Sequence, residues 1–353
     1  MKLYPSVNII FIVWLVCLLF ISFLGFSTLP HSQRFSNNFF ESFSNWDGGH
    51  FLGIAQKGYQ QNFQYAFFPL FPLAVKFLTN FTGNFLLSAV LISLFSFYFG
   101  LQILYKLIAR DFDKKIAQKA IAVLVFFPTS FYFLTAYSEG LFFLLVVLAF
   151  YFLRSNKLFL ATIFASLASG TRLAGLAVVL ALILEVQLTA GINKKNWFVL
   201  LSPLGFIVYA YFLLNLTADP LYFITAEKHW QRQLAVPIFG FWDAIKNITI
   251  PGFLTSNFST SLDLLFAIFG LGLTIRSFRF LPISYSVYAS VSIALPLFTP
   301  TLSSMPRFVL PIFPIFILLG LVKSNFLNLF YQVISLLLLS FFTILFFNGF
   351  WVA

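Results

Sequence analysis

The sequence has 353 residues, of which 60% are hydrophobic and only 9% are charged. Soluble globular chains carry about 25% charged residues, so this composition excludes an ordinary soluble domain and indicates a polytopic membrane protein. The formal net charge of +11 does not require a nucleic-acid partner, because lysine and arginine gathered in cytoplasmic loops give the same excess. The single cysteine, Cys17, excludes a disulfide framework and a cysteine metal cluster.

Apolar segments of helical length recur along the whole chain. The first, at 7–27, is longer than a typical signal-peptide core and has no convincing small-residue cleavage site, so we expect a retained helix. Several later segments are short for a membrane span, so we expect about eleven spans, with an error of about two in the count. The predicted spans are 7–27, 84–108, 120–136, 140–153, 158–169, 173–189, 197–216, 263–275, 280–297, 307–322 and 327–349.

Lysine and arginine placement favours a cytoplasmic N-terminus, because nearly all of the excess positive charge then lies on the cytoplasmic side. Two polar segments, 28–83 and 217–262, are too long for turns and fall on the outer side. We therefore expect a single integral membrane domain over 1–353 with two long outer loops. No glycine-rich phosphate loop occurs, so a nucleotide-driven cytoplasmic reaction is poorly supported. The short cytoplasmic connections favour a prokaryotic plasma membrane.

The stretch "WDGGHFLGIAQKGY" (46–59) places the most constrained acid, Asp47, between Trp46 and the pair Gly48 and Gly49. Such glycines let the backbone approach a ligand closely. Apolar residues recur at helical spacing after His50, which predicts an interfacial helix with Asp47 and His50 at its start. Asp47 is then either the N-cap of that helix or a rigidly held functional carboxylate, and the two roles are compatible.

Six segments together resemble the PIG-V-type mannosyltransferases, which are membrane enzymes of the GT-C glycosyltransferase class. The opening stretch is followed by "YAFFPLFP" (65–72), as in the first outer loop of that family. The other similar segments are "FPTSFYFLTAYSEGLFFLL" (127–145), "SGTRLAGL" (169–176), "ADPLYFITAEKHWQR" (218–232) and "RFVLPIFP" (307–314). The resemblance implies an all-α, GT-C-like bundle whose outer loops bear interfacial helices.

It also implies sugar transfer, with mannose the expected sugar, from a polyprenyl-phosphate donor to a glycolipid or glycan acceptor on the outer face. We expect Asp47 to act as the base of an inverting transfer, and His50 to hold the acceptor or the phosphate. Each has a structural alternative, such as a helix cap or a polar residue in a wet interface. The expected substrate-binding residues are Trp46, Gly48, Gly49, Glu139, Arg172, Trp230, Arg232 and Arg307.

Arginines at the outer helix ends suit a lipid phosphate, because a guanidinium can donate two hydrogen bonds to its oxygens. Snorkelling to the interface is the structural alternative for Arg172 and Arg307. Glu139 is more simply a structural ion-pair partner than a substrate ligand.

Cofactors other than the lipid-linked co-substrate are not expected, and a metal is doubtful because the three histidines are scattered. The "DFD" stretch at 111–113 lies among cytoplasmic lysines, where a solvated charge run is the better interpretation. The rival function is a transporter or flippase of lipid-linked sugars, although no internal repeat is found. A structural subunit of a larger assembly stays open, whereas a hydrolase lacks the HExxH and GxSxG motifs. The expected partners are membrane lipid and the two substrates; no feature sets an oligomeric state.

Overall fold

The computed structural model describes residues 4–32, 38–248 and 258–352, and within these ranges the chain forms helices and turns without a strand. Residues 33–37 and 249–257 of the two predicted outer segments lie outside the described residues. The chain folds into two compact units. Unit 1 comprises Met1–Gly58, Leu70–Asn156 and Phe316–Val352, and unit 2 comprises Tyr59–Pro69 and Lys157–Ile315.

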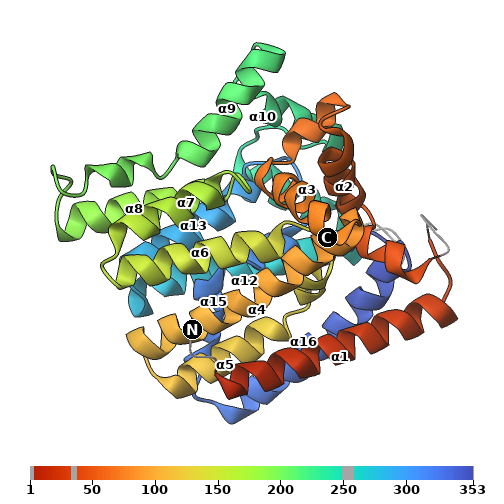
Figure 1. Ribbon diagram of the computed structural model, residues 1–353. Coiled ribbons are helices and arrows are strands. Elements are labelled where there is room, and N and C mark those ends of the chain that lie inside the picture. The colour runs from red at the N-terminus through yellow and green to blue at the C-terminus, as the bar shows by residue number, and fades with distance from the viewer. Residues whose placement is uncertain (1–3, 33–37, 249–257, 353) are drawn as a thin grey trace. The chain divides into compact units, whose positions relative to one another are not determined.

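Unit 1 is built around the long helix α4, which packs along α6, while α1 and α16 run side by side (Figure 1). The polar outer segment contributes two further helices, α2 and α3, which pack on each other and on α4. The elements are α1 (Pro5–Thr28), η1 (Phe39–Ser44), α2 (Asp47–Lys57), α3 (Leu70–Thr82), α4 (Phe85–Asp111), α5 (Lys114–Val125), η3 (Ser130–Leu134), α6 (Glu139–Arg154), the end of α15 (Phe313–Gly320) and α16 (Asn325–Phe347).

Unit 2 centres on α8, which packs against α7 and α13, and on α12, which packs against α13. Its second polar segment forms three short elements, α10, η5 and α11. The elements are η2 (Asn62–Ala66), α7 (Leu158–Ser169), α8 (Gly175–Thr189), η4 (Trp197–Leu201), α9 (Leu204–Thr217), α10 (Tyr222–Ala226), η5 (Glu227–Trp230), α11 (Pro237–Ile248), α12 (Phe258–Phe280), α13 (Ile283–Leu297), α14 (Met305–Val309) and the start of α15.

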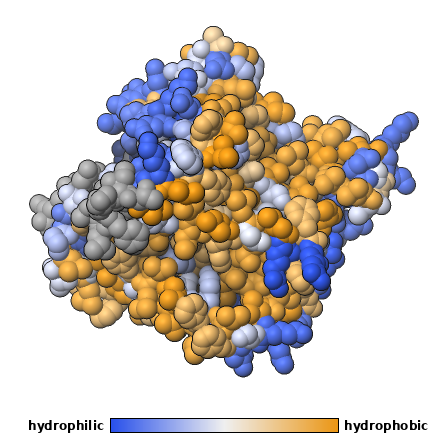
Figure 2. All heavy atoms as spheres, turned by 180° about the vertical axis from the view of Figure 1, so that it is seen from behind, coloured by the Kyte–Doolittle hydropathy of each residue, from blue (hydrophilic) through white to orange (hydrophobic). Residues whose placement is uncertain are grey.

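The exposed surface is largely apolar, as expected of an integral membrane protein. Helix α1 exposes 62% of Phe20, and α16 exposes 74% of Phe326. Figure 2 shows apolar residues over much of one face, with hydrophilic residues gathered toward its margins. Five helices in the described ranges are long and apolar enough to cross a bilayer: Pro5–Thr28, Phe85–Asp111, Trp197–Thr217, Ser259–Phe280 and Asn325–Phe347.

Proline explains the breaks in two of the predicted spans. The span predicted at 120–136 is helix α5, which starts earlier and ends at Val125, followed by the short turn η3. Pro128 lacks an amide hydrogen and disfavours a helical conformation at the residue before it. The span predicted at 307–322 is divided into α14 and α15, with Pro311 in the gap between them.

Side-chain caps fix several helix starts. Asn84 accepts a hydrogen bond from the Leu87 amide at 2.9 Å and so caps α4. Asp113 accepts from the Ile116 amide at 2.7 Å and caps α5. Its neighbour Asp111 forms an ion pair with Arg154 at 3.1 Å. Both acids of the "DFD" stretch therefore have structural partners.

Candidate active site

The first predicted motif forms a sharp turn into helix α2. Trp46 occupies the N-cap position with φ 59° and ψ −124°, a backbone conformation that is costly for a residue other than glycine. Strain of this kind costs about 1–3 kcal/mol and is concentrated at functional sites in proteins. Asp47 is the first helical residue, so the expectation that it is the N-cap is wrong by one position. The carboxylate lies in the first turn, where the helix dipole favours negative charge.

This turn packs against the "AYSE" segment, about ninety residues later in the chain. A Cβ on Gly48 would lie 3.3 Å from the Tyr137 ring, so only glycine fits there without displacing a neighbour. The Tyr137 hydroxyl donates to the Asn45 carbonyl at 2.9 Å, and the Ala136 amide donates to the Phe43 carbonyl at 2.9 Å. Two of the family-like segments thus meet within unit 1, at the residues that flank Asp47.

The end of the chain completes the support of this turn. The Asn45 side chain donates to the Phe346 carbonyl at 2.9 Å, and the Trp46 indole donates to the Phe350 carbonyl at 3.3 Å. The Trp46 and Trp351 rings pack edge to face at 5.2 Å between centroids. These C-terminal contacts were missed by sequence reasoning, because nothing in the composition of the last helix distinguishes them from lipid-facing residues.

Glu139 begins helix α6 and has no exposed surface. The next residue, Gly140, allows α6 to touch α4, since a Cβ there would lie 2.3 Å from the Ser93 carbonyl oxygen. Such complete burial favours the structural role for Glu139 over direct contact with a substrate.

A pocket of about 970 Å³ opens beside helix α2 in unit 1. Trp46, Gly49 and His50 all line it, so it reaches the neighbours of Asp47 on both sides along the chain. The rest of its lining comes from η1, from residues further along α2 and from the start of α4. His50 is half-buried. It lies in the first turn of α2, the turn that also carries Asp47.

In unit 2, the "SGTR" turn between α7 and α8 carries Arg172. Ser169 is fully buried; its hydroxyl donates to the Ser166 carbonyl at 2.7 Å and accepts from the Phe206 amide at 3.1 Å. A Cβ on Gly175 would lie 2.3 Å from the Ala168 carbonyl oxygen, so glycine is required where α8 starts. Ser169 and Gly175 therefore shape the turn, and Arg172 is its half-buried charged member.

Two of the candidate phosphate-binding arginines contact or belong to the segment 303–311 of unit 2, and the third, Arg172, is linked to it through Tyr288. Arg172 interacts electrostatically with Tyr288, whose hydroxyl donates to the Pro311 carbonyl at 3.0 Å. Arg307 lies within helix α14 and is only 7% exposed. Arg232 donates to the Ser303 carbonyl. A buried cation of this kind is more costly than a snorkelling one, which favours a specific role for Arg307.

Asp263 is a further polar residue of this region whose placement the sequence did not reveal. It is only 8% exposed and accepts a hydrogen bond from the Met305 amide at 3.0 Å, at the start of α14. Arg232 interacts electrostatically with Asp263 and also packs over the Phe308 ring at 4.7 Å. Asp263 and Arg232 thus hold the short helix that carries Arg307.

Trp230 belongs to an aromatic cluster that joins the "YAFFPLFP" segment to the second polar segment. Its ring meets Phe63 and Phe67 edge to face, each at 5.6 Å, while His229 stacks on Phe63. Nearby, the Tyr59 hydroxyl donates to the Phe67 carbonyl at 2.6 Å. Burial raises the pKa of Tyr59 above its ordinary value, so this hydroxyl stays a neutral donor.

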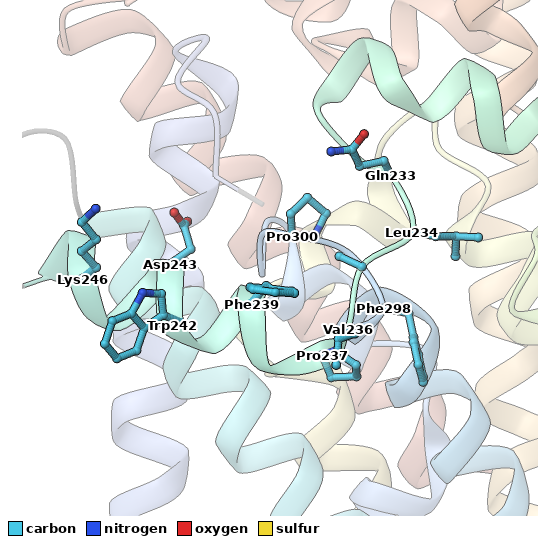
Figure 3. Close-up of a pocket in the computed structure, with 11 residues that line it drawn as sticks. Gln233, Leu234, Val236, Pro237, Phe239, Trp242, Asp243, Lys246, Phe298 and Pro300 are labelled. Carbon is cyan, nitrogen blue, oxygen red and sulfur yellow. The ribbon is translucent and has the colours of Figure 1, made fainter.

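A second pocket, of about 900 Å³, lies along helix α11 in unit 2. Its lining is mostly apolar, with Phe239 and Trp242 from helix α11 and Phe298 and Pro300 from the segment that follows α13 (Figure 3). The pocket starts at Gln233, directly after Arg232 in the sequence. Pro300 is close in sequence to Ser303, the hydrogen-bond acceptor of Arg232, so Arg232 and the apolar pocket are neighbours along the chain at both places.

The predicted site residues are therefore divided between the units. Unit 1 holds Trp46, Asp47, Gly48, Gly49, His50 and Glu139, and unit 2 holds Arg172, Trp230, Arg232 and Arg307. Among the described residues, no group of three histidine, cysteine, aspartate or glutamate side chains is placed to hold a metal ion.

The fold resembles that of a solved membrane enzyme. A crystal structure of ArnT from Cupriavidus metallidurans bound to undecaprenyl phosphate superposes with a TM-score of 0.53 at 14% identity. The match covers 92% of this chain and 62% of that one. This similarity establishes the GT-C-like helical fold.

Sequence comparison gives the family. The human GPI alpha-1,6-mannosyltransferase 2 is 33% identical over 144 residues, and the GPI mannosyltransferase 2 of Drosophila pseudoobscura pseudoobscura is 33% identical over 108. These matches cover 38% and 28% of this chain, and 29% and 24% of the respective relatives. The model of the mannosyltransferase family PIG-V matches residues 16–202, a range that includes the Asp47 turn, the "AYSE" segment and Arg172. Because this range is more than half of the chain, the protein belongs to the PIG-V mannosyltransferase family.

Proposed function

We propose that the protein transfers a mannosyl group from a polyprenyl-phosphate donor to a hydroxyl of a glycolipid or glycan acceptor. The acceptor oxygen attacks the anomeric carbon and forms the new glycosidic bond while the bond between that carbon and the phosphate oxygen breaks. Asp47 takes the hydroxyl proton, and the polyprenyl phosphate leaves with the bonding electrons. Attack from the face opposite the phosphate inverts the anomeric configuration.

The rigid Asp47 turn is the observation that carries this proposal. Its strained residue, Trp46, is held by the C-terminal segment, and Gly48 is held against Tyr137 of a second family-like segment. A carboxylate on such a support can accept a proton without first reorganising, and a general base of this kind contributes about 10²–10⁴-fold to the rate. The strain at Trp46 itself costs stability, which favours a functional reason for this turn.

The arginines of unit 2 supply the complementary chemistry. Arg307 belongs to the segment 303–311, Arg232 contacts it, and Arg172 is linked to it through Tyr288. A guanidinium binds phosphate oxygens through two hydrogen bonds. The apolar pocket along α11 starts next to Arg232 and suits the first isoprene units of the donor lipid. In this arrangement the phosphate of the leaving group is neutralised where its hydrocarbon tail begins.

We assign the reaction to the non-cytoplasmic face of the membrane. The Asp47 turn and the α11 pocket belong to the two long polar segments, which the distribution of lysine and arginine assigns to the outer side. No soluble nucleotide is needed there, because the donor remains in the bilayer through its lipid tail.

Purified protein incubated with polyprenyl-phosphate mannose and a panel of glycolipid acceptors tests the proposal. We expect transfer by the wild type, and loss of transfer in Asp47→Ala and Asp47→Asn. The matched control is Asp113→Asn, since asparagine also caps a helix and Asp113 has no role in the reaction. Movement of the donor across vesicle membranes without any transfer would overturn the proposal in favour of a flippase.

A further inference from the structure

The pocket beside helix α2 has the chemistry of a carbohydrate site. Its wall combines aromatic faces with amide, carboxylate and imidazole groups. Phe40 lines it and exposes 68% of its surface. Exposed on the same lining are Glu41 from η1 and Gln56 from α2. Sugar rings present apolar C–H faces to aromatic rings, and their hydroxyls pair with carboxylate and amide side chains.

The charge of the pocket separates it from a phosphate site. Among its described lining residues there is no lysine or arginine, and Glu41 is a carboxylate that repels an anion. The arginine-bearing segment 303–311, by contrast, belongs to unit 2. A neutral polyhydroxylated group therefore fits the α2 pocket better than the phosphate of the donor does.

The pocket is also placed next to the proposed base. Trp46 precedes Asp47, Gly49 and His50 follow it, and all three line the pocket. The wall of the pocket is open at Gly49, which has no side chain. Even a Cβ built on Gly49 would come no closer to another residue than 3.6 Å, the distance to the Ser44 carbonyl oxygen. A ligand in the pocket is thus bounded by the same helical turn that carries Asp47.

We propose that this pocket binds the terminal sugar of the acceptor through its hydroxyl groups, an inference that rests on the proposed sugar transfer. Gln56 and Glu41 bind hydroxyls remote from the reacting one, and Phe40 packs against the sugar ring. The occupant is the glycan head itself, whether it is part of a lipid or free in solution.

The test uses the full-length protein in detergent, with octyl mannoside, octyl glucoside and octyl galactoside as acceptor probes and the methyl glycosides as lipid-free counterparts. Gln56→Ala, Glu41→Gln and Phe40→Ala alter exposed side chains, so each variant should fold. We expect the KM for the preferred acceptor to rise about 3- to 10-fold in each, as for the loss of one hydrogen bond or contact. The KM for the donor should not change.

Lys57→Ala is the matched control, because Lys57 is the exposed neighbour of Gln56 on α2 and does not line the pocket. Equal KM changes for methyl and octyl acceptors support recognition of the glycan head. Changes confined to octyl acceptors would overturn the inference in favour of a lipid-contact surface. An unchanged acceptor KM in all three variants would also overturn it, while loss of transfer in Asp47→Asn would leave the proposed function standing.

Discussion

The two glycines after Asp47 make different contacts, so alanine should act in opposite directions at the two positions. In Gly48→Ala, the new methyl lies 3.3 Å from the Tyr137 ring, 3.4 Å from Ser44 Cβ and 3.5 Å from the Ala136 carbonyl oxygen. The Tyr137 ring is fully buried, and its hydroxyl is tied to Asn45 at 2.9 Å. A shift of the ring by a few tenths of an ångström therefore strains that hydrogen bond and the packing around the ring.

Overpacking of a buried site costs about 1–3 kcal/mol, whereas replacing a helical glycine by alanine gains about 0.5–1 kcal/mol. We expect Gly48→Ala to lower the free energy of unfolding by about 1–2 kcal/mol, since the clash exceeds the gain. In Gly49→Ala the nearest neighbour is 3.6 Å away, an ordinary contact, so the helix gain of up to about 1 kcal/mol should remain.

Thermal unfolding of both variants in one detergent, followed by the fluorescence of the tryptophans, measures the difference. Gly272→Ala serves as a control, because a Cβ there meets nothing within 4 Å. The same samples should show that Gly48→Ala lowers kcat, by displacing the support of Asp47, while Gly49→Ala chiefly raises the acceptor KM. If Gly49→Ala proved less stable than Gly48→Ala, the described packing of the turn would be refuted.

Three further predictions concern unit 2. Trp242→Ala removes an aromatic side chain from the lining of the α11 pocket. The donor KM should therefore rise several-fold for a donor with a long polyprenyl chain and little for one with a short chain. An equal rise for both donors would contradict lipid binding in this pocket. Gly175→Ala places a Cβ within 2.4 Å of three backbone atoms, so the variant should not fold. The monodisperse peak of folded protein in size-exclusion chromatography should then be absent. A normal yield of folded protein would show that α8 starts elsewhere. Ser169→Ala leaves the Phe206 amide without its acceptor and should cost about 1–3 kcal/mol in thermal unfolding without altering the acceptor KM.

Much of this architecture could be predicted from the sequence. The long apolar helices carry a composition signal strong enough to place α1, α4 and α16 within a few residues. Local helix breaks were harder, because Pro128 and Pro311 lie in apolar runs whose hydropathy does not drop. The N-cap of α2 was predicted at Asp47, but the structure places it one residue earlier, at Trp46. No sequence rule anticipates a tryptophan with a positive φ at this position.

The site was predictable only in part. The motif itself identified Asp47 and its neighbours, and the arginine positions at helix ends identified candidates for phosphate binding. The contacts from Phe346 and Phe350 to the turn could not be predicted, because they use backbone carbonyls that any sequence would offer. Asp263 carried a hint, as an acid at the edge of an apolar segment, but its hydrogen bond to Met305 depends on the fold.

The rate of a single turnover in Asp47→Asn tests the central claim most directly. The variant is mixed with saturating donor and acceptor, and donor binding is measured separately. The proposed base predicts unchanged donor affinity and a transfer rate about 10²–10⁴-fold below that of wild type, with Asp113→Asn at the wild-type rate. A wild-type rate of sugar transfer in Asp47→Asn would contradict it.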